Sequence, residues 1–167
     1  MQKIPMNPLE AYISYWKNTF NMSGRARRKE YWWSVLFNSL ITVLISCLLE
    51  ALHVKGTANY AVTMILAVIF LVPDFSVTVR RFHDNGLSGK WAVPMFALTL
   101  IAIFFPDFGE SELNKGVTND YINNTIVVSS ILLFITLLGY FIFMIFTMMK
   151  EGEQGTNQYG DDPKHSR

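Results

Sequence analysis

Charged residues are scarce in this chain, and their scarcity argues against an ordinary soluble domain. Only 16% of the 167 residues are charged, whereas 51% are hydrophobic. Soluble domains carry roughly 25% charged residues. We therefore expect a protein that is solvated in part by lipid. The net charge of +1 gives no reason to expect a nucleic-acid partner.

Cysteine is almost absent as well. The single cysteine, Cys47, excludes a disulfide within the chain. It lies in an apolar run, where we expect it to behave as a small hydrophobic side chain. No secretory signal peptide is visible, because the first apolar run begins only at Ser34 and is too long for a cleaved leader.

Long apolar runs are what the chain does have. An α-helix needs about 20 apolar residues to cross a bilayer. Four runs predict such spans, at about 34–52, 60–79, 91–105 and 125–149. The last contains IVVSSILLFITLLGYFIFMIF and lacks the regularly spaced polar residues that a soluble bundle needs. The predicted fold class is all-α, an integral membrane four-helix bundle.

The distribution of lysine and arginine predicts the orientation of the spans. Twelve of the fourteen basic residues lie before the first span, between the second and third, or after the fourth. Cytoplasmic segments of membrane proteins carry such an excess. We therefore expect a multi-pass membrane protein with both termini in the cytoplasm. The outer loop 106–124 is expected to be solvated and faintly acidic.

The amino-terminal segment NPLEAYISYWKNTF predicts an amphipathic helix that lies on the membrane. Asn7, Pro8 and Glu10 form its start signal, a capping box with proline in the first helical position. Its apolar stripe at helical spacing consists of Leu9, Tyr12, Ile13, Trp16 and Phe20. Packing of this helix on its own domain is the alternative.

Two basic clusters, in SGRARRKEYWW and VRRFHDNGLSGKW, supply the candidate site. The candidate residues for binding an anionic ligand or lipid are Arg25, Arg27, Arg28, Arg80, Arg81, His83 and Asp84. Guanidinium groups suit bidentate contacts to phosphate, and a histidine could report pH near neutrality. If the first two spans pack together, these side chains can converge on a lipid phosphate.

A purely structural interpretation explains the same residues. The arginines are then positive-inside anchors, and Glu30 or a lipid phosphate offsets the cations at the start of the first span. Arg80 and Asp84 lie four apart on one helix face and can form an ion pair. Asn85 and Gly86 supply a turn before the third span.

Asp74 is the carboxylate that lies deepest within a predicted span. An ionisable residue in a membrane is by default a functional hypothesis. Its expected partners are Arg81 or Thr78 on the same helix face, or Asn38 from the first span. We predict either a proton or ion pathway through Asp74 or a position near the interface, where Pro73 kinks the helix.

Motifs for metal binding and catalysis are missing from the sequence. His83 and Asp84 are adjacent and diverge on a helix, so we expect no metal site. The chain shows no Gly-rich phosphate loop and no nucleophile elbow. We expect no cofactor and no enzymatic activity.

Three blocks of the sequence resemble a known family. They are FNMSGRARRKEYWW (20–33), RRFHDNGLSGKW (80–91) and GTNQYGDDP (155–163). In order and spacing they are similar to the bacterial inner-membrane family catalogued as domain of unknown function 805. Lys90 departs from the family pattern, which often has a second tryptophan there. The resemblance implies a small four-span integral membrane protein and no particular biochemical activity.

We divide the chain into a cytoplasmic interfacial helix with a basic segment (1–33), a transmembrane domain (34–149) and a cytoplasmic tail (150–167). The polar composition of the tail predicts disorder. Its family-like residues instead predict a fixed turn that folds back onto the basic face. In that arrangement Asp161 and Asp162 would pair with arginines.

The leading functional hypothesis is a non-enzymatic inner-membrane protein whose cytoplasmic surface binds anionic lipid headgroups or partner proteins. The alternative is a small oligomeric transporter or channel that uses Asp74. A lipid-headgroup-modifying enzyme is the third hypothesis. The expected partners are anionic lipids, other proteins or further copies of the chain.

Single cysteines in a Cys47→Ala background test the predicted orientation. In spheroplasts, a membrane-impermeant maleimide should label Lys55→Cys and Lys115→Cys. It should label Lys90→Cys and Lys164→Cys only after lysis, because the positive-inside rule places them in the cytoplasm. Labelling of Lys90→Cys and Lys164→Cys from opposite faces would contradict the prediction.

Overall fold

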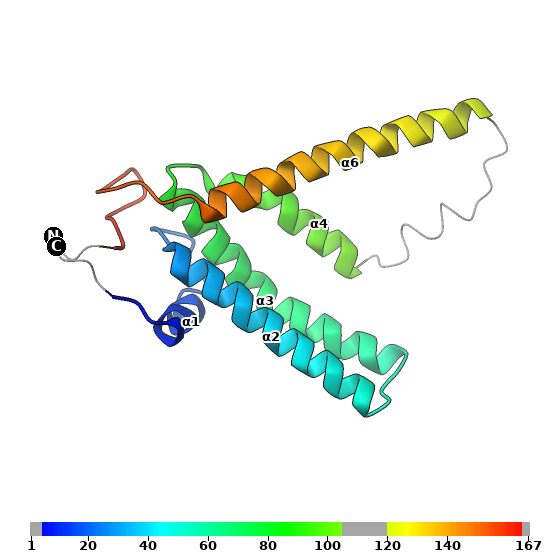
Figure 1. Ribbon diagram of the computed structural model, residues 1–167, viewed down its shortest axis with the longest axis horizontal. Helices are drawn as coiled ribbons and strands as arrows, with labels where there is room; N and C mark the ends of the chain where they lie inside the picture. The colour runs from blue at the N-terminus through cyan, green and yellow to red at the C-terminus, as the bar shows by residue number, and fades with distance from the viewer. Residues whose placement is uncertain (1–4, 105–119, 165–167) are drawn as a thin grey trace.

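The computed structural model describes residues 5–104 and 120–164, and its regular structure is helical throughout these ranges (Figure 1). The elements are α1 (Pro8–Lys17), α2 (Arg28–Ala51), α3 (Thr57–Asp84), η1 (Gly89–Ala92), α4 (Val93–Phe104) and α6 (Asp120–Met149). The predicted all-α class is therefore confirmed for this part of the chain. The predicted outer loop lies, up to residue 119, outside the described residues.

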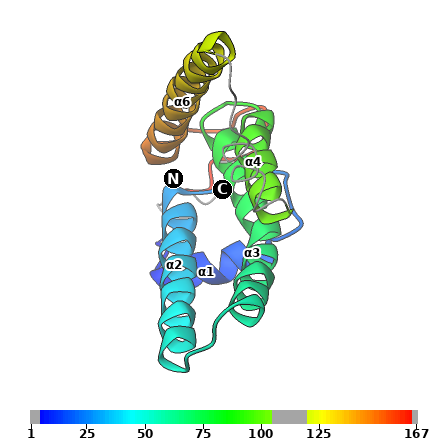
Figure 2. The same cartoon turned by 90° about the vertical axis from the view of Figure 1, so that its right-hand side faces the viewer.

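Helices α2 and α3 form an antiparallel pair and lie side by side (Figures 1 and 2). Both are long and apolar enough to cross a membrane, as is Val128–Met149 of α6. The third predicted span, about 91–105, corresponds to η1 and α4. Its α4 has 12 residues, about 18 Å at 1.5 Å per residue, against a hydrocarbon core of about 30 Å. Three described helices, rather than four, thus have the length of a span.

Helix α6 joins the other helices through its carboxyl-terminal turns. Met144 and Met148 are buried there in a cluster with Val79 and Phe82 of α3. Toward its amino-terminal end α6 diverges from α2 and α3 (Figures 1 and 2), and residues 128–139 are exposed on every side. An apolar helix exposed all round is typical of a lipid-facing span.

Helix α1 crosses α2 and α3 near one end of the pair (Figure 2). Its predicted capping box is confirmed: the Asn7 side chain accepts from the Glu10 amide at 2.8 Å, and Glu10 accepts from the Asn7 amide at 3.0 Å. Ala11 and Tyr15 are fully buried against the neighbouring helices, whereas the stripe residues Leu9 and Ile13 are exposed. One face of α1 therefore packs on the domain, and an apolar face remains for a membrane surface.

The turn after α3 and the carboxyl-terminal tail cover the end of the molecule at which α3 ends. Asn85 ends α3, and Gly86 follows with a φ of 73°, a left-handed conformation that glycine adopts without strain. The tail residues 150–164 lie across the same end (Figure 1), and Asn157 and Gly160 exchange two main-chain hydrogen bonds in a turn. The tail folds back onto the basic face, so disorder, the other interpretation, is wrong for these residues.

Ser76 fixes the end of α1 to α3, and its removal should destabilise the protein. Its buried hydroxyl lies 2.7 Å from the main-chain oxygens of Asn18 and Asn21, to which it donates. Ser76→Ala should lower the free energy of unfolding by about 1 kcal/mol, measured as a lower melting temperature in detergent. Thr136→Ala is the control, because that exposed hydroxyl bonds only within α6. Equal shifts for the two variants would refute the role of Ser76.

Candidate functional site

Asp84, at the last position of α3, is the centre of the polar contacts at this end. Its side chain is fully buried. Arg25, from the link before α2, reaches Asp84 Oδ1 with Nε and Nη2, each at 2.9 Å, and Arg81 donates to Oδ2. The predicted ion pair between Arg80 and Asp84 is therefore wrong. The carboxylate instead pairs with Arg81, three positions back, and with an arginine 59 residues away in sequence.

Both arginines also bind the main chain of the tail. Arg25 donates to the carbonyl oxygens of Glu153 and Gly155, and Arg81 donates to those of Met148 and Lys150. Carbonyl groups at the end of a helix carry partial negative charge that favours nearby cations. Met148 lies at the end of α6, so Arg81 caps that helix. We name this assembly of Asp84, Arg25, Arg81 and the tail the Asp84 junction.

His83 is a further attachment point for the tail. Its ring stacks on Tyr159 with centroids 3.9 Å apart and planes 4° apart. Its Nδ1 lies 3.1 Å from the carbonyl oxygen of Gly24, and its own carbonyl accepts from the Asn157 amide at 3.0 Å. The histidine therefore joins the tail to the link before α2. Its predicted role as a pH reporter stays a prediction.

Arg80 directly precedes Arg81 on α3 but binds a different partner. It forms a buried ion pair with Glu30 of α2, at 2.6 Å between Nη1 and Oε1. Its remaining guanidinium nitrogens, Nε and Nη2, are buried without a hydrogen-bond partner among the described residues. A buried donor without a partner costs about 1–3 kcal/mol. Arg80 thus retains two strong donors that the described part of the chain does not satisfy.

A polar cavity of about 290 Å³ adjoins Arg80. Among the residues that line it are Arg25, Arg27, Arg80, Glu30, Asn18 and Ser23. We name it the arginine cavity. Three cations and one carboxylate face it, so its net charge is positive. No side chain caps the start of α2 at Arg27, and the amino terminus of a helix carries partial positive charge as well.

Arg28 and Lys29 occupy the outer surface beside this cavity. Arg28 is half-exposed and pairs with Glu151 of the tail at 2.8 Å. With Trp32, Trp33 and Met149 the two cations line an open groove between the start of α2 and the end of α6. Tryptophans beside cations are typical of the headgroup level of a membrane.

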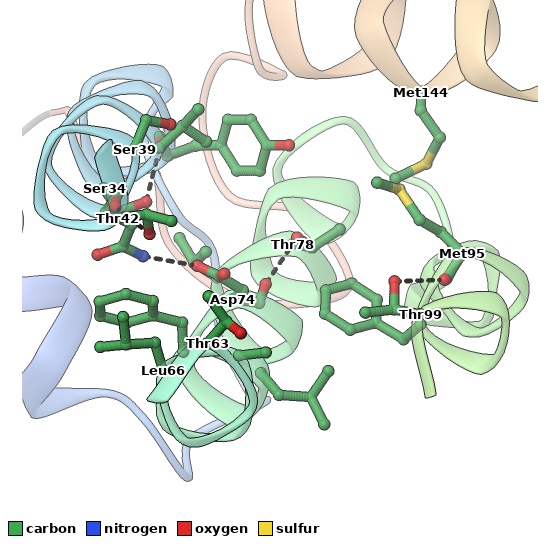
Figure 3. Close-up of a pocket in the computed structure, with 18 of the residues that line it drawn as sticks. Ser34, Ser39, Thr42, Thr63, Leu66, Asp74, Thr78, Met95, Thr99 and Met144 are labelled. Carbon is green, nitrogen blue, oxygen red and sulfur yellow. Dashed lines mark hydrogen bonds between the residues drawn. The ribbon is translucent and has the colours of Figure 1, made fainter. Parts of the chain in front are cut away.

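Asp74, labelled in Figure 3, lies nearer the amino-terminal end of α3, in a separate cluster. Its Oδ1 accepts from the Tyr15 hydroxyl at 2.7 Å and from the Asn38 amide at 3.1 Å. The predicted contact between Asp74 and Asn38 is confirmed, whereas the other two predicted contacts are not. The predicted contact with Arg81 is wrong, because its guanidinium belongs to the Asp84 junction. The Thr78 hydroxyl donates to the main-chain oxygen of Asp74 rather than to its carboxylate.

Tyr15 is the partner of Asp74 that sequence reasoning missed. The tyrosine lies off the apolar stripe of α1, on the face that packs against α2 and α3. Burial and the nearby charge of Asp74 raise the pKa of Tyr15, so its hydroxyl remains a donor. The available signal in the sequence was its spacing of three residues from Tyr12, which places the two tyrosines side by side on the helix. The Tyr12 hydroxyl also reaches this cluster, donating to Asn38 at 3.0 Å.

A second cavity, of about 670 Å³, opens beside this cluster between α2, α3 and α4 (Figure 3). Asp74, Asn38, Thr42 and Thr99 are among its lining residues. We name it the Asp74 cavity. Among the residues that the structure describes, no three His, Cys, Asp or Glu side chains gather closely enough to hold a metal ion.

The family comparison decides where this chain belongs. A family model described as "Protein of unknown function (DUF805)" matches residues 19–161. This chain belongs to the DUF805 family. The matched region contains the Asp84 junction, Arg80 and Asp74, so each of these features lies within the family domain. The resemblance of the three sequence blocks is thereby confirmed.

This chain is similar to three proteins from Escherichia coli, two of which are named inner membrane proteins. It is 28% identical to inner membrane protein YhaI over 156 residues, which cover 93% of this chain and 97% of YhaI. It is 31% identical to inner membrane protein YhaH over 101 residues, 58% of this chain and 84% of that one. The uncharacterized protein YiiR is 28% identical over 144 residues, 86% of each chain. No solved structure matches.

Gly152 tests the close packing of the Asp84 junction. A Cβ at this position would overlap the Asp84 carboxylate. Overpacking of this kind costs about 1–3 kcal/mol, so Gly152→Ala should lower the melting temperature in detergent. Gly139→Ala is the control: its Cβ meets nothing within 4 Å, and alanine favours the helix by about 1 kcal/mol. If Gly152→Ala is as stable as Gly139→Ala, the tail does not approach Asp84 as described.

Proposed function

We propose that this DUF805 protein is a non-enzymatic inner-membrane component that binds the phosphate of an anionic lipid in the arginine cavity. We further propose that the protein is multi-pass, with both termini and this cavity on the cytoplasmic side. The observation that carries the proposal is the buried guanidinium of Arg80, two of whose nitrogens have no hydrogen-bond partner among the described residues. The positive-inside distribution of its basic residues supports the orientation.

The geometry of Arg80 fits a phosphate oxygen better than it fits water. Nη1 is held by Glu30, so the orientation of the guanidinium plane is fixed before a ligand arrives. Nε and Nη2 are adjacent donors on one edge of that plane, the edge that binds two oxygens of a phosphate at once. A phosphate would supply the acceptors that the described residues lack there.

The surroundings of Arg80 add charge and neutral donors. Arg27 and Arg25 line the same cavity, together with the amide side chains of Asn18 and Asn21. The Arg25 guanidinium is engaged by Asp84 and the tail, so its contribution is mainly its charge. Arg27 donates to the Pro163 carbonyl, which holds it at the mouth of the cavity.

A lipid is favoured over a partner protein because of the size and position of the cavity. A volume of about 290 Å³ accommodates a phosphate with its ester groups, not a peptide segment. The adjacent groove of Arg28, Lys29, Trp32 and Trp33 lies where the glycerol and the second headgroup charge would extend. Each cation near an anionic leaflet adds about 1 kcal/mol of attraction.

Native mass spectrometry of the full-length protein tests this proposal. We expect the wild type, released from phosphatidylcholine vesicles that contain phosphatidylglycerol, to retain phosphatidylglycerol selectively. Arg80→Lys keeps a cation for Glu30 but removes the forked donors, so retention should fall about tenfold, as when a charge-assisted bond is lost. The melting temperature of the variant shows whether the fold persists.

Lys55→Gln is the matched control, because it removes a cation from the loop at the opposite end of α2. It should retain phosphatidylglycerol as the wild type does. The proposal fails if the wild type retains phosphatidylcholine equally well. It also fails if folded Arg80→Lys retains as much phosphatidylglycerol as the wild type.

A further inference from the structure

Most hydroxyl groups that line the Asp74 cavity can accept a hydrogen bond from a ligand but cannot donate one. Five hydroxyl groups in its lining donate their protons to main-chain oxygens of their own helices, at 2.7 to 3.0 Å. They belong to Ser34, Thr42, Thr63, Thr78 and Thr99. A hydroxyl that donates its single proton in this way retains only acceptor capacity. These oxygens can therefore accept from a ligand but cannot donate to it.

The side-chain nitrogen of Asn38 and the hydroxyl of Tyr15 beside this cavity are also engaged. Asn38 uses its side-chain nitrogen on the Tyr15 hydroxyl and on Asp74, and the Tyr15 proton goes to Asp74 as well. Both hydrogen bonds that the described residues make to the carboxylate end on Oδ1. The second oxygen, Oδ2, is left for a ligand. Ser39 and Tyr31, whose hydroxyls can donate, also line the cavity. Acceptors nonetheless outnumber donors on the polar wall.

The charge of the cavity is also one-sided. Among the residues described around it, Asp74 is the one carboxylate, and no lysine, arginine or histidine joins the lining. The rest of the wall is apolar and includes the aromatic rings of Phe70 and Phe96. Aromatic faces attract cations, and a carboxylate in an apolar site favours an opposite charge.

We propose that the Asp74 cavity binds an organic ammonium ion with an apolar body, whose N–H groups donate to Asp74 Oδ2 and to the wall hydroxyls. The volume of about 670 Å³ lies within the usual range for small-molecule sites, about 300–1,000 Å³. A lipid headgroup that carries both an ammonium and a phosphate is disfavoured, because no cation in the described lining would pair with the phosphate. The ligand is therefore a phosphate-free amine, and this site is independent of the arginine cavity.

The test compares two ligands of nearly equal shape, phenethylammonium and the neutral 2-phenylethanol. Binding is measured by calorimetry on the full-length protein in phosphatidylcholine nanodiscs, with empty nanodiscs as the blank. The wild type should bind the ammonium at least about tenfold more tightly, the difference expected of a charge-assisted bond. Equal affinity for the two ligands would overturn the proposal, whatever the variants do.

Two variants locate the binding. Asp74→Asn preserves shape and an acceptor for Tyr15 but removes the charge, so affinity for phenethylammonium should fall about tenfold or more while 2-phenylethanol binds as before. Ala67→Phe, which fills part of the lining, should weaken both ligands. Unchanged ammonium affinity in folded Asp74→Asn, or in both variants, would place the amine elsewhere. Arg80→Lys should leave ammonium binding intact, which separates this site from the lipid site.

Discussion

The buried negative charge of Asp84 is the constraint on which the architecture depends. A carboxylate removed from water costs several kcal/mol unless cations and hydrogen bonds replace the solvent. Here two guanidinium groups replace it, one from the same helix and one from the link before α2. Those groups have further donors, which the main-chain oxygens of the tail accept. One acidic side chain thereby draws three distant segments into a single structure.

Two further charged side chains of α3, nearer its amino-terminal end, are also bound by residues of other helices. Arg80 finds its counter-charge on α2, through Glu30, and Asp74 finds its donors on α1 and α2, through Tyr15 and Asn38. Arg80 and Asp74 thus both meet partners from other elements. The packing of apolar surfaces in lipid provides no hydrophobic force between helices, so these polar contacts determine how α1 and α2 sit on α3. The two cavities lie beside the same contacts, where donors or acceptors remain in excess.

Much of this could be predicted from sequence, because helices, caps and charge clusters follow from local spacing. The capping box of Asn7 and the contact between Asn38 and Asp74 were predicted correctly. The partners of Arg80 and Asp84 were not, because a four-residue spacing shows that two side chains share a face but not which other segment covers that face. Besides Asp84, the acceptors for Arg25 are main-chain carbonyls, which every residue possesses and no sequence pattern marks.

The position of the tail at the Asp84 junction has a consequence for biosynthesis. During translation the ribosome releases Arg25 first, then Arg81 and Asp84, and only much later the residues around Glu153 and Gly155 that satisfy their donors. Until then the two guanidinium groups have their shared carboxylate but not the tail carbonyls that accept from them in the folded protein. The order of translation thus requires that the contacts of Arg25 and Arg81 are completed only after all the helices have been synthesised.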